Sequence, residues 1–138
     1  MKDYGDLRQI MVWVKDRFVM GRSDYHYRHE PILYGWKSTG KHEFYGGRDK
    51  DTVWEIQRPS ANREHPTKKP VALIAKAIQE GCTMEGIVLD VFGGSGSTLV
   101  ACEQTKRSCY MMEIDPKYCT VILDRWEKLT GQKANKIS

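Results

Sequence analysis

The 138-residue sequence predicts an α/β protein in which parallel strands and helices follow a loop-rich β region. Three observations support this. Residues 63–132 alternate helix, strand, helix, strand and helix, which is typical of a parallel sheet with right-handed crossovers. Ten of the 14 aromatic residues lie within residues 1–60, so the two regions have different roles. A glycine-rich turn in the second region joins an apolar strand to a helix.

The first region, residues 1–62, is expected to hold short strands and long loops. Three runs have the residues that favour strands: IMVWV at 10–14, PILYGW at 31–36 and TVWEI at 52–56. The segment between the first two runs is dense in Arg, Tyr and His. Residues 37–62 are otherwise rich in glycine and charge, which predicts loops.

The second region, residues 63–132, has clear signals for helix starts and stops. Thr67 is expected to cap a helix entered through Pro70, and Gly81 lies just past its end. Asp115 with Pro116 begins the last helix, which Gly131 ends. Between them we expect a strand at 87–92, a helix at 98–104 and a strand at 108–114, with both strands buried on both faces. Residues 133–138 are expected to fray.

The turn at 93–98 is the strongest chemical signal. Glycines there allow close approach to a ligand, and the following helix offers unpaired N–H groups to an anion. Glu113 follows Asp90 by 23 residues, at the tip of the next strand, where an acid can bind ribose hydroxyls. A dinucleotide fingerprint fails because Leu99 stands where its third glycine belongs, and a P-loop lysine is missing. The pattern indicates a nucleoside-containing cofactor.

Ordered motifs carry a family resemblance. DVFGGSGST at 90–98 resembles the S-adenosylmethionine motif D-x-F-x-G-S-G-[ST]-T of amino-group DNA methyltransferases, which make N6-methyladenine or N4-methylcytosine in restriction-modification systems. HPTKKP at 65–70 is similar to the segment that precedes it in the permuted, beta-class-like members. EIDPKY at 113–118 with Arg125 resembles the family's E-x-x-x-x-Y…R ending, and residues 13–37 of the first region resemble phage and prophage members. The resemblance implies a partial Rossmann-like S-adenosylmethionine-dependent methyltransferase fold.

The resemblance also implies a cofactor site. Phe92, Gly94 and Gly96 would shape the methionine pocket, and Glu113 would bind the ribose. For Lys69 a solvated position at the helix start remains an alternative, and His65 could simply pack there. The implied cofactor-binding residues are Asp90, Phe92, Gly93, Gly94, Ser95, Gly96, Ser97, Thr98, Glu113, His65, Thr67 and Lys69.

Cations and aromatic rings interleave in the first region, as a nucleic-acid surface requires. A solvated loop with a few core aromatics is the alternative. His26 and His29 have metal-compatible spacing but no third ligand nearby, so no metal site is expected. The resemblance favours contact with double-stranded DNA through Lys15, Arg17, Arg22, Tyr25, Tyr27, Arg28 and Lys37.

The sequence contains no D/N/S-P-P-Y/F/W motif, which in this family holds the target amine. Asp115-Pro116-Lys117-Tyr118 is better interpreted as a helix cap. The chain then corresponds to the C-terminal part of a methyltransferase, from a truncated gene, a split gene or a chain shortened for expression, with no catalytic residue of its own. We expect no methylation by the chain alone, and a partner that is either a complementing N-terminal methyltransferase chain or a second copy.

Other functions stay open. A catalytically inactive DNA- or cofactor-binding remnant fits the missing motif, and an RNA or small-molecule methyltransferase would keep the glycine turn. A net charge of +4, no apolar run of membrane-spanning length and no signal-peptide pattern favour a cytoplasmic protein without membrane association. The four cysteines form no CxxC pair and are expected to be reduced.

Overall fold

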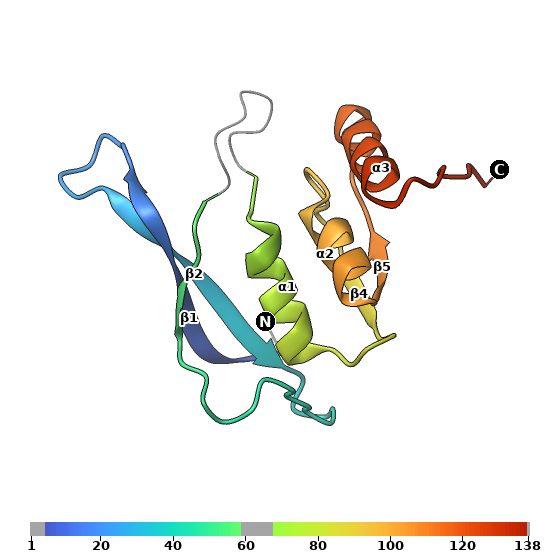
Figure 1. Cartoon of the computed structure of the whole chain (residues 1–138). Helices are drawn as coiled ribbons and strands as arrows, with labels where there is room; N and C mark the ends of the chain where they lie inside the picture. Colours follow the sequence, from blue (N-terminus) through green and yellow to red (C-terminus); the bar gives the residue numbers. More distant parts are fainter. Residues whose placement is uncertain (1–4, 59–67, 138) are drawn as a thin grey trace. The chain divides into compact units, whose positions relative to one another are not determined.

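The computed structural model describes residues 5–58 and 68–137, which fall into two compact units (Figure 1). The first unit, Met1–Arg58, contains a small sheet. The second unit, Pro59–Ser138, contains the helices together with a parallel strand pair. Within the described residues, no helix is long and apolar enough to cross a membrane.

A three-stranded sheet forms the first unit. Its strands are β1 (Asp6–Val19), β2 (Tyr27–Trp36) and β3 (Val53–Glu55), in the order β2-β1-β3. β1 runs antiparallel to β2 and parallel to β3. Strands at all three predicted places are confirmed, but the hairpin of β1 and β2 extends well beyond the apolar runs that predicted it. Its outer parts are mostly exposed and mix polar with isolated apolar residues, so hydrophobic patterning could not mark them.

Two tryptophans form the centre of this sheet. Trp13 on β1 lies opposite Trp54 on β3, and both are buried. The Trp13 indole N–H donates to the carbonyl of Ile56 at 2.7 Å, which fastens the chain after β3 to β1. At the other end of the hairpin, a Cβ on Gly35 would lie 2.3 Å from the Asp6 carbonyl oxygen, so only glycine lets the strands approach there.

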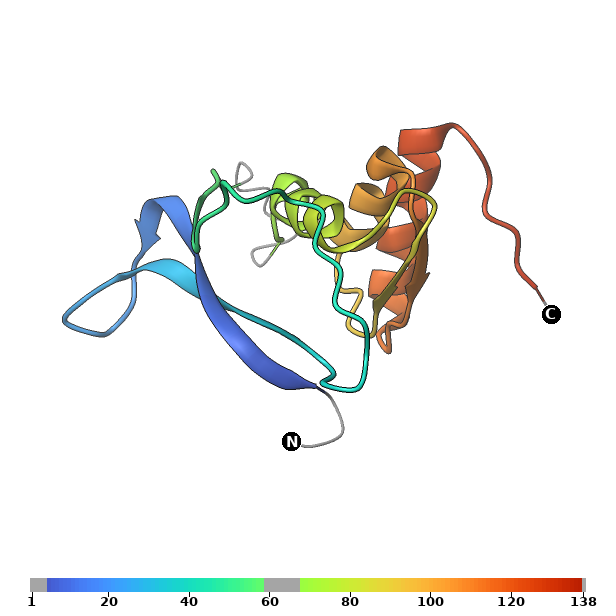
Figure 2. The same cartoon turned by 90° about the horizontal axis from the view of Figure 1, so that it is seen from below.

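The second unit has the predicted order of helices and strands. It comprises α1 (Val71–Gly81), β4 (Ile87–Asp90), α2 (Ser97–Thr105), β5 (Ser108–Met111) and α3 (Pro116–Thr130), with β4 parallel to β5 (Figure 2). Ile78, Ala101 and Cys102 form the buried core between α1 and α2. Val88 and Cys109, one from each strand, pack against that core.

The helix ends follow the predicted punctuation closely. Asp115 caps α3 by accepting the Lys117 N–H at 2.9 Å, and Gly131 ends the helix with a φ of 72°. α1 begins after Pro70 as predicted, whereas Thr67, its predicted cap, lies outside the described residues. Gly81 is the last helical residue rather than the first one past the end, so that prediction was wrong by one position.

The prediction that both strands of the second unit are buried on both faces was wrong. Alternate residues face the helices, but Ile87, Leu89 and Tyr110 on the opposite face are exposed. The cause is that α1 and α2 pack on one side, and no other element within residues 68–137 covers the second side. Within the described residues β4 pairs only with β5, so its other edge is free.

All four cysteines carry free thiols. Burial, reinforced by the neighbouring Cys109, raises the pKa of Cys102 to about 12, so this thiol stays protonated at neutral pH. Cys102 therefore serves as a small apolar core residue.

Candidate functional site

A cleft of about 430 Å³ opens in the second unit at the carboxyl ends of β4 and β5. Ligands of parallel α/β sheets bind at this end of the strands. The glycine turn, the tip of β5 and the start of α1 all contribute to its wall. The lining residues are Lys68, Lys69, Ile74, Asp90, Phe92, Gly93, Gly94, Ser95, Ser97, Thr98, Glu113, Asp115 and Tyr118.

The turn between β4 and α2 needs its glycines for backbone reasons. Gly94 and Gly96 have φ angles of +52° and +75°, in the left-handed region that side chains disfavour. A Cβ on Gly93 would lie 2.7 Å from the sulfur of Met111. The turn therefore runs close over β5 and delivers the N-terminus of α2, with its unpaired amides, to the cleft.

Glu113 links the turn after β4 to the segment after β5 in this cleft. One carboxylate oxygen accepts the Gly94 N–H at 2.6 Å, and the other accepts the Asp115 N–H at 2.9 Å. These backbone donors, that of Asp115 first and that of Gly94 second, hold the pKa of Glu113 below its usual value. A carboxylate offers about four lone-pair positions, so acceptor capacity remains for hydroxyl groups of a ligand.

Asp90 and Phe92 lie at the start of the turn. A carboxylate oxygen of Asp90 accepts the Phe92 N–H at 3.0 Å, which fixes the backbone where β4 ends. The Phe92 side chain is 87% exposed and borders the cleft. An exposed ring beside a polar cleft provides an apolar surface for a ligand.

Basic residues also lie at this cleft. Arg125 from α3 donates to the carbonyl of Ser95 and, at 3.3 Å, to its hydroxyl. The Ser97 hydroxyl donates to the Lys69 carbonyl at 3.0 Å and so ties α2 to the entry of α1. Burial and the nearby Arg125 lower the pKa of Lys68. The cleft therefore holds charges of both signs, which suits a ligand that is itself zwitterionic.

Most residues predicted for cofactor binding come together in this cleft. Gly96 is the described member that does not line it, because it sits behind the turn against Ile122. His65 and Thr67 lie outside the described residues. Sequence reasoning did not assign four lining residues; Asp115 and Tyr118 lay in the recognised EIDPKY segment and Lys68 in HPTKKP, whereas Ile74 gave no signal. Those four are Lys68, Ile74, Asp115 and Tyr118.

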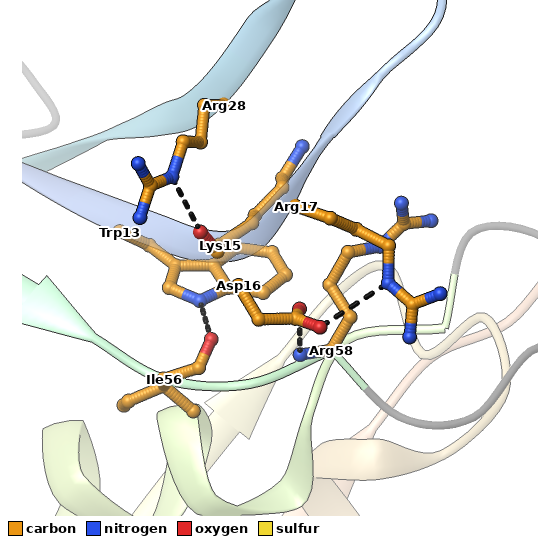
Figure 3. Close-up of polar contacts among 7 residues, drawn as sticks. All are labelled: Trp13, Lys15, Asp16, Arg17, Arg28, Ile56 and Arg58. Carbon is orange, nitrogen blue, oxygen red and sulfur yellow. Dashed lines mark hydrogen bonds and ion pairs between the residues drawn. The ribbon is translucent and has the colours of Figure 1, made fainter.

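The predicted DNA-contacting residues divide into groups on the hairpin. Near the base of its loop, β1 has extra residues between Val14 and Val19 that disrupt its pairing with β2. Figure 3 shows Arg17 and Arg28 at this bulge. Arg17 is exposed and pairs with Asp16 at 3.2 Å, and Arg28 donates to the Lys15 carbonyl at 3.1 Å.

Lys15 differs from the other cations. Its side chain is 7% exposed, pairs with Glu30 at 2.8 Å and lies over the Trp13 ring. The ammonium group thus has a structural partner inside the sheet, and it does not belong to the exposed basic surface.

The hairpin loop carries the aromatic members of the predicted set. Tyr25 is 89% exposed, Tyr27 and Arg22 are also exposed, and Phe18 stacks on His26 with ring centroids 5.1 Å apart. A second cleft, of about 370 Å³, opens along residues 23–27 and His29. Lys37 follows the far end of β2, about 30 Å away along the strand.

Sequence reasoning missed the contact that holds the bulge. A carboxylate oxygen of Asp16 accepts the backbone N–H of Arg58 at 3.1 Å, and this bond lowers the pKa of Asp16 (Figure 3). Arg58 lies 42 positions along the chain and gave no sequence signal. Arg58 and Arg17 both bond to the Asp16 carboxylate, Arg58 through its backbone N–H and Arg17 through its guanidinium. Among residues 5–58 and 68–137, no cluster of His, Cys, Asp or Glu is suited to hold a metal ion.

Comparisons with known proteins agree with this arrangement. The chain is 29% identical to the Type II methyltransferase M.Cfr9I of Citrobacter freundii, over 95% of this chain and 47% of that protein. It is 31% identical to the Type II methyltransferase M.XycI of Xanthomonas campestris pv. cyanopsidis, over 78% of this chain and 35% of that protein. The chain thus spans about half or less of the length of these curated relatives.

A solved structure extends the likeness to three dimensions. The crystal structure of the M1.HpyAVI–SAM complex superposes with a TM-score of 0.75 at 28% identity, over 87% of this chain and 62% of that one. A family model described as DNA methylase matches residues 2–124, which includes the hairpin, the glycine turn and Glu113. The chain belongs to this DNA methylase family.

Proposed function

We propose that this chain carries the cofactor-binding and DNA-contacting parts of an S-adenosylmethionine-dependent methyltransferase. The complete enzyme transfers a methyl group to an exocyclic amine of adenine or cytosine in double-stranded DNA. The motif order is that of the permuted class, the first region is similar to phage or prophage members, and the place of action is the cytoplasm, where DNA and cofactor meet.

The main support for the proposal is that the Glu113 carboxylate accepts a hydrogen bond from the backbone N–H of Gly94 in the glycine turn. A ligand that reaches this acid also reaches the N-terminal amides of α2 and the Phe92 ring. S-adenosylmethionine has matching groups, namely ribose hydroxyls, a carboxylate and an adenine ring. The residues present therefore fit the cofactor.

Each wall of the cleft has a proposed task. Glu113 accepts hydroxyl hydrogens of the ribose, while Thr98 and the first-turn amides of α2 bind the carboxylate. Lys68 and Lys69 border the cleft on the side next to the start of α1. Asp90 and Arg125 touch the turn itself, so they act as positioning residues.

Bound S-adenosylmethionine supplies an electrophilic methyl group on its sulfonium. Transfer also needs acceptors that hold the target amine and a ring that stacks on the extruded base. The sequence contains no D/N/S-P-P-Y/F/W segment, and we propose that such a segment, supplied by the rest of the fold, performs this task. That segment belongs to the same polypeptide or to a complementing chain.

For DNA contact we propose the exposed face of the hairpin. Arg17, Arg22 and Arg28 neutralise phosphates, and Tyr25 and Tyr27 offer rings to bases. Lys37 adds a cation at the distant end. Lys15 has a structural role in the sheet, because its ammonium group forms an ion pair with Glu30.

Calorimetric titration of S-adenosylmethionine into cofactor-free protein tests the proposal. The wild-type chain should bind one equivalent. Glu113→Gln should weaken binding at least about tenfold, because a hydrogen bond to a charged acceptor contributes about 1.5–3 kcal/mol.

The matched control is Asp124→Asn, which removes an exposed carboxylate on α3 outside the cleft. This variant should bind like wild type. Absence of binding by the folded wild-type chain, or equal binding by Glu113→Gln, would refute the assigned pocket.

A further inference from the structure

The loop of the β1–β2 hairpin contains a cleft whose polar side chains the proposed phosphate and ring contacts do not use. The cleft has a volume of about 370 Å³, and its walls come from the loop and the first residues of β2. Two exposed rings border it, because Tyr25 is 89% exposed and Tyr27 is 67% exposed. We call it the loop cleft, and its lining residues are Ser23, Asp24, Tyr25, His26, Tyr27 and His29.

Contacts within the hairpin hold the loop in this shape. Nδ1 of His26 accepts the backbone N–H of Gly21 at 3.3 Å, which closes the loop. The same ring stacks on Phe18, with the two planes 18° apart. Because Nδ1 is an acceptor here, the neutral imidazole carries its hydrogen on Nε2. His26 therefore brings one N–H donor to the loop cleft.

The charge of the loop cleft favours a base over a phosphate group. Asp24 is its acidic residue, and no lysine or arginine lines it. Among the described residues Asp24 has no hydrogen-bond or ion-pair partner, so both of its carboxylate oxygens are available to a ligand. A carboxylate repels phosphate groups, whereas it accepts hydrogen bonds from the N–H groups of nucleobases.

The two tyrosine rings require a base that has left the helical stack. Neighbouring bases cover both faces of a base in a duplex, so a side-chain ring can stack only on an unpaired or extruded base. The Watson–Crick edge of that base is exposed in the same state. The loop cleft thus combines rings for the face of an unstacked base with polar groups for its edge.

Guanine is the base whose Watson–Crick edge matches these polar groups. It presents two donors side by side, N1–H and the 2-amino group, which fit the two carboxylate oxygens of Asp24. Its O6 acceptor lies next to them and suits the N–H donor of His26. Adenine, cytosine and thymine place an acceptor beside each edge donor, so one oxygen of Asp24 would face an acceptor in those bases.

We propose that the loop cleft binds an unstacked guanine of the DNA, with the Asp24 carboxylate on its Watson–Crick edge and a tyrosine ring on its face. This rests on the proposed function, because it takes DNA as the substrate and names the base that the hairpin loop recognises. Asp24 and His26 are then specificity-determining residues, whereas Arg17 and Arg22 supply affinity that does not depend on sequence.

The test measures, by fluorescence anisotropy, the binding of the 138-residue chain to labelled duplexes with one bulged nucleotide. A bulged base is already unpaired, so it enters a site at little cost. The duplexes differ only in the bulged base, which is guanine, hypoxanthine, adenine, cytosine or thymine. Hypoxanthine is guanine without its 2-amino group. The guanine bulge should bind at least about tenfold more tightly than any other, because a hydrogen bond to a charged acceptor contributes that much.

Substitutions in the loop cleft separate its edge contacts from its ring contacts. Asp24→Ala should abolish the preference for guanine. Asp49→Ala is the matched control, because it removes an exposed carboxylate outside the loop cleft with the same change in net charge, and it should keep the preference. Tyr25→Ala should weaken binding of every bulged duplex about fivefold or more, whereas Tyr25→Phe, which keeps the ring, should bind like wild type.

Three results would overturn the inference: equal binding of all bulged duplexes by wild type, tightest binding of a base other than guanine, or a guanine preference that survives in Asp24→Ala. A duplex without a bulge is titrated at several salt concentrations in the same series. If it binds in a salt-dependent manner but no guanine preference is seen, the base site is refuted and the proposed DNA contact stands. If no duplex binds, the proposed DNA contact is refuted together with the base site.

Discussion

Gly96 and Gly81 make a matched pair at the residue scale. Gly96 has a φ of +75°, and a Cβ there would lie 3.0 Å from a side-chain carbon of Ile122. Gly81 has no atom within 4 Å of its Cβ position and no positive φ. Gly96→Ala should lower the free energy of unfolding by about 1–2 kcal/mol, whereas Gly81→Ala should raise it by about 0.4–1 kcal/mol.

Urea unfolding followed by far-UV circular dichroism measures both changes, because every described helix lies in the second unit. Equal effects of the two substitutions would show that the turn does not need its left-handed conformation.

Glu113 predicts a pH dependence. Its pKa is lowered by the N–H groups of Asp115 and Gly94, so folding favours its ionised form. The stability that it contributes is present above its ordinary pKa of about 4.5 and is lost as pH falls through the lower folded value. Wild type should therefore be more stable than Glu113→Gln at neutral pH, and the difference should vanish at low pH.

Urea unfolding at a series of pH values provides the measurement, with Asp124→Asn as control. A difference that persists undiminished in acid would mean that the carboxylate charge is not what the backbone N–H groups bind.

At this scale the sequence predicted local contacts better than distant ones. The rules for helix starts and stops span only a few residues. They predicted the roles of Asp115, Pro116 and Gly131 at the ends of α3, and all three roles are confirmed. Lys15 is different, because its partner Glu30 depends on hairpin register. A lysine in a basic, aromatic stretch gives no sign that its ammonium will be buried.

Among the elements, the β1–β2 hairpin makes the clearest prediction. Binding of duplex DNA should weaken as salt rises, and the slope of log K against log salt should fall by about 1 for Arg17→Ala or Arg22→Ala. Lys15→Met should leave that slope unchanged and instead destabilise the sheet by about 1 kcal/mol, because the ion pair between Lys15 and Glu30 is lost.

Fluorescence anisotropy with labelled duplex at several salt concentrations gives the slopes, and the same titrations with RNA test the choice of nucleic acid. If Lys15→Met lowered the slope while the arginine variants did not, the exposed hairpin face would not be the phosphate-binding surface.

The sequence predicted the order of the helices and strands, but it did not predict what packs against each of them. The apolar runs around Leu89 and Tyr110 correctly predicted parallel strands. They also predicted burial on both faces, and this prediction was wrong for the described residues. Hydrophobicity indicates what a strand is suited to contact, whereas here helices cover only one side. The predicted hairpin was too short for the opposite reason, since its paired outer residues are mostly exposed and mix polar with isolated apolar side chains.

At the scale of the whole molecule, the proposed cofactor cleft lies at the end of a sheet in which β4 pairs only with β5 within the described residues. The matches cover most of this chain's residues but only part of each relative. Its core joins α1, α2 and two strands, and this suffices to position the glycine turn against Glu113. In the proposed function binding and chemistry are separated: the described residues bind the cofactor, and the chemistry needs a D/N/S-P-P-Y/F/W segment that this sequence does not contain.

The most direct measurement of that separation is a single incubation of the pure chain with unmethylated duplex DNA and methyl-labelled S-adenosylmethionine. Label should be retained on the protein, reversibly and less so with Glu113→Gln, and none should enter the DNA. Label in the DNA with the wild-type chain, but not with Glu113→Gln, would show that these 138 residues methylate on their own and would contradict the account.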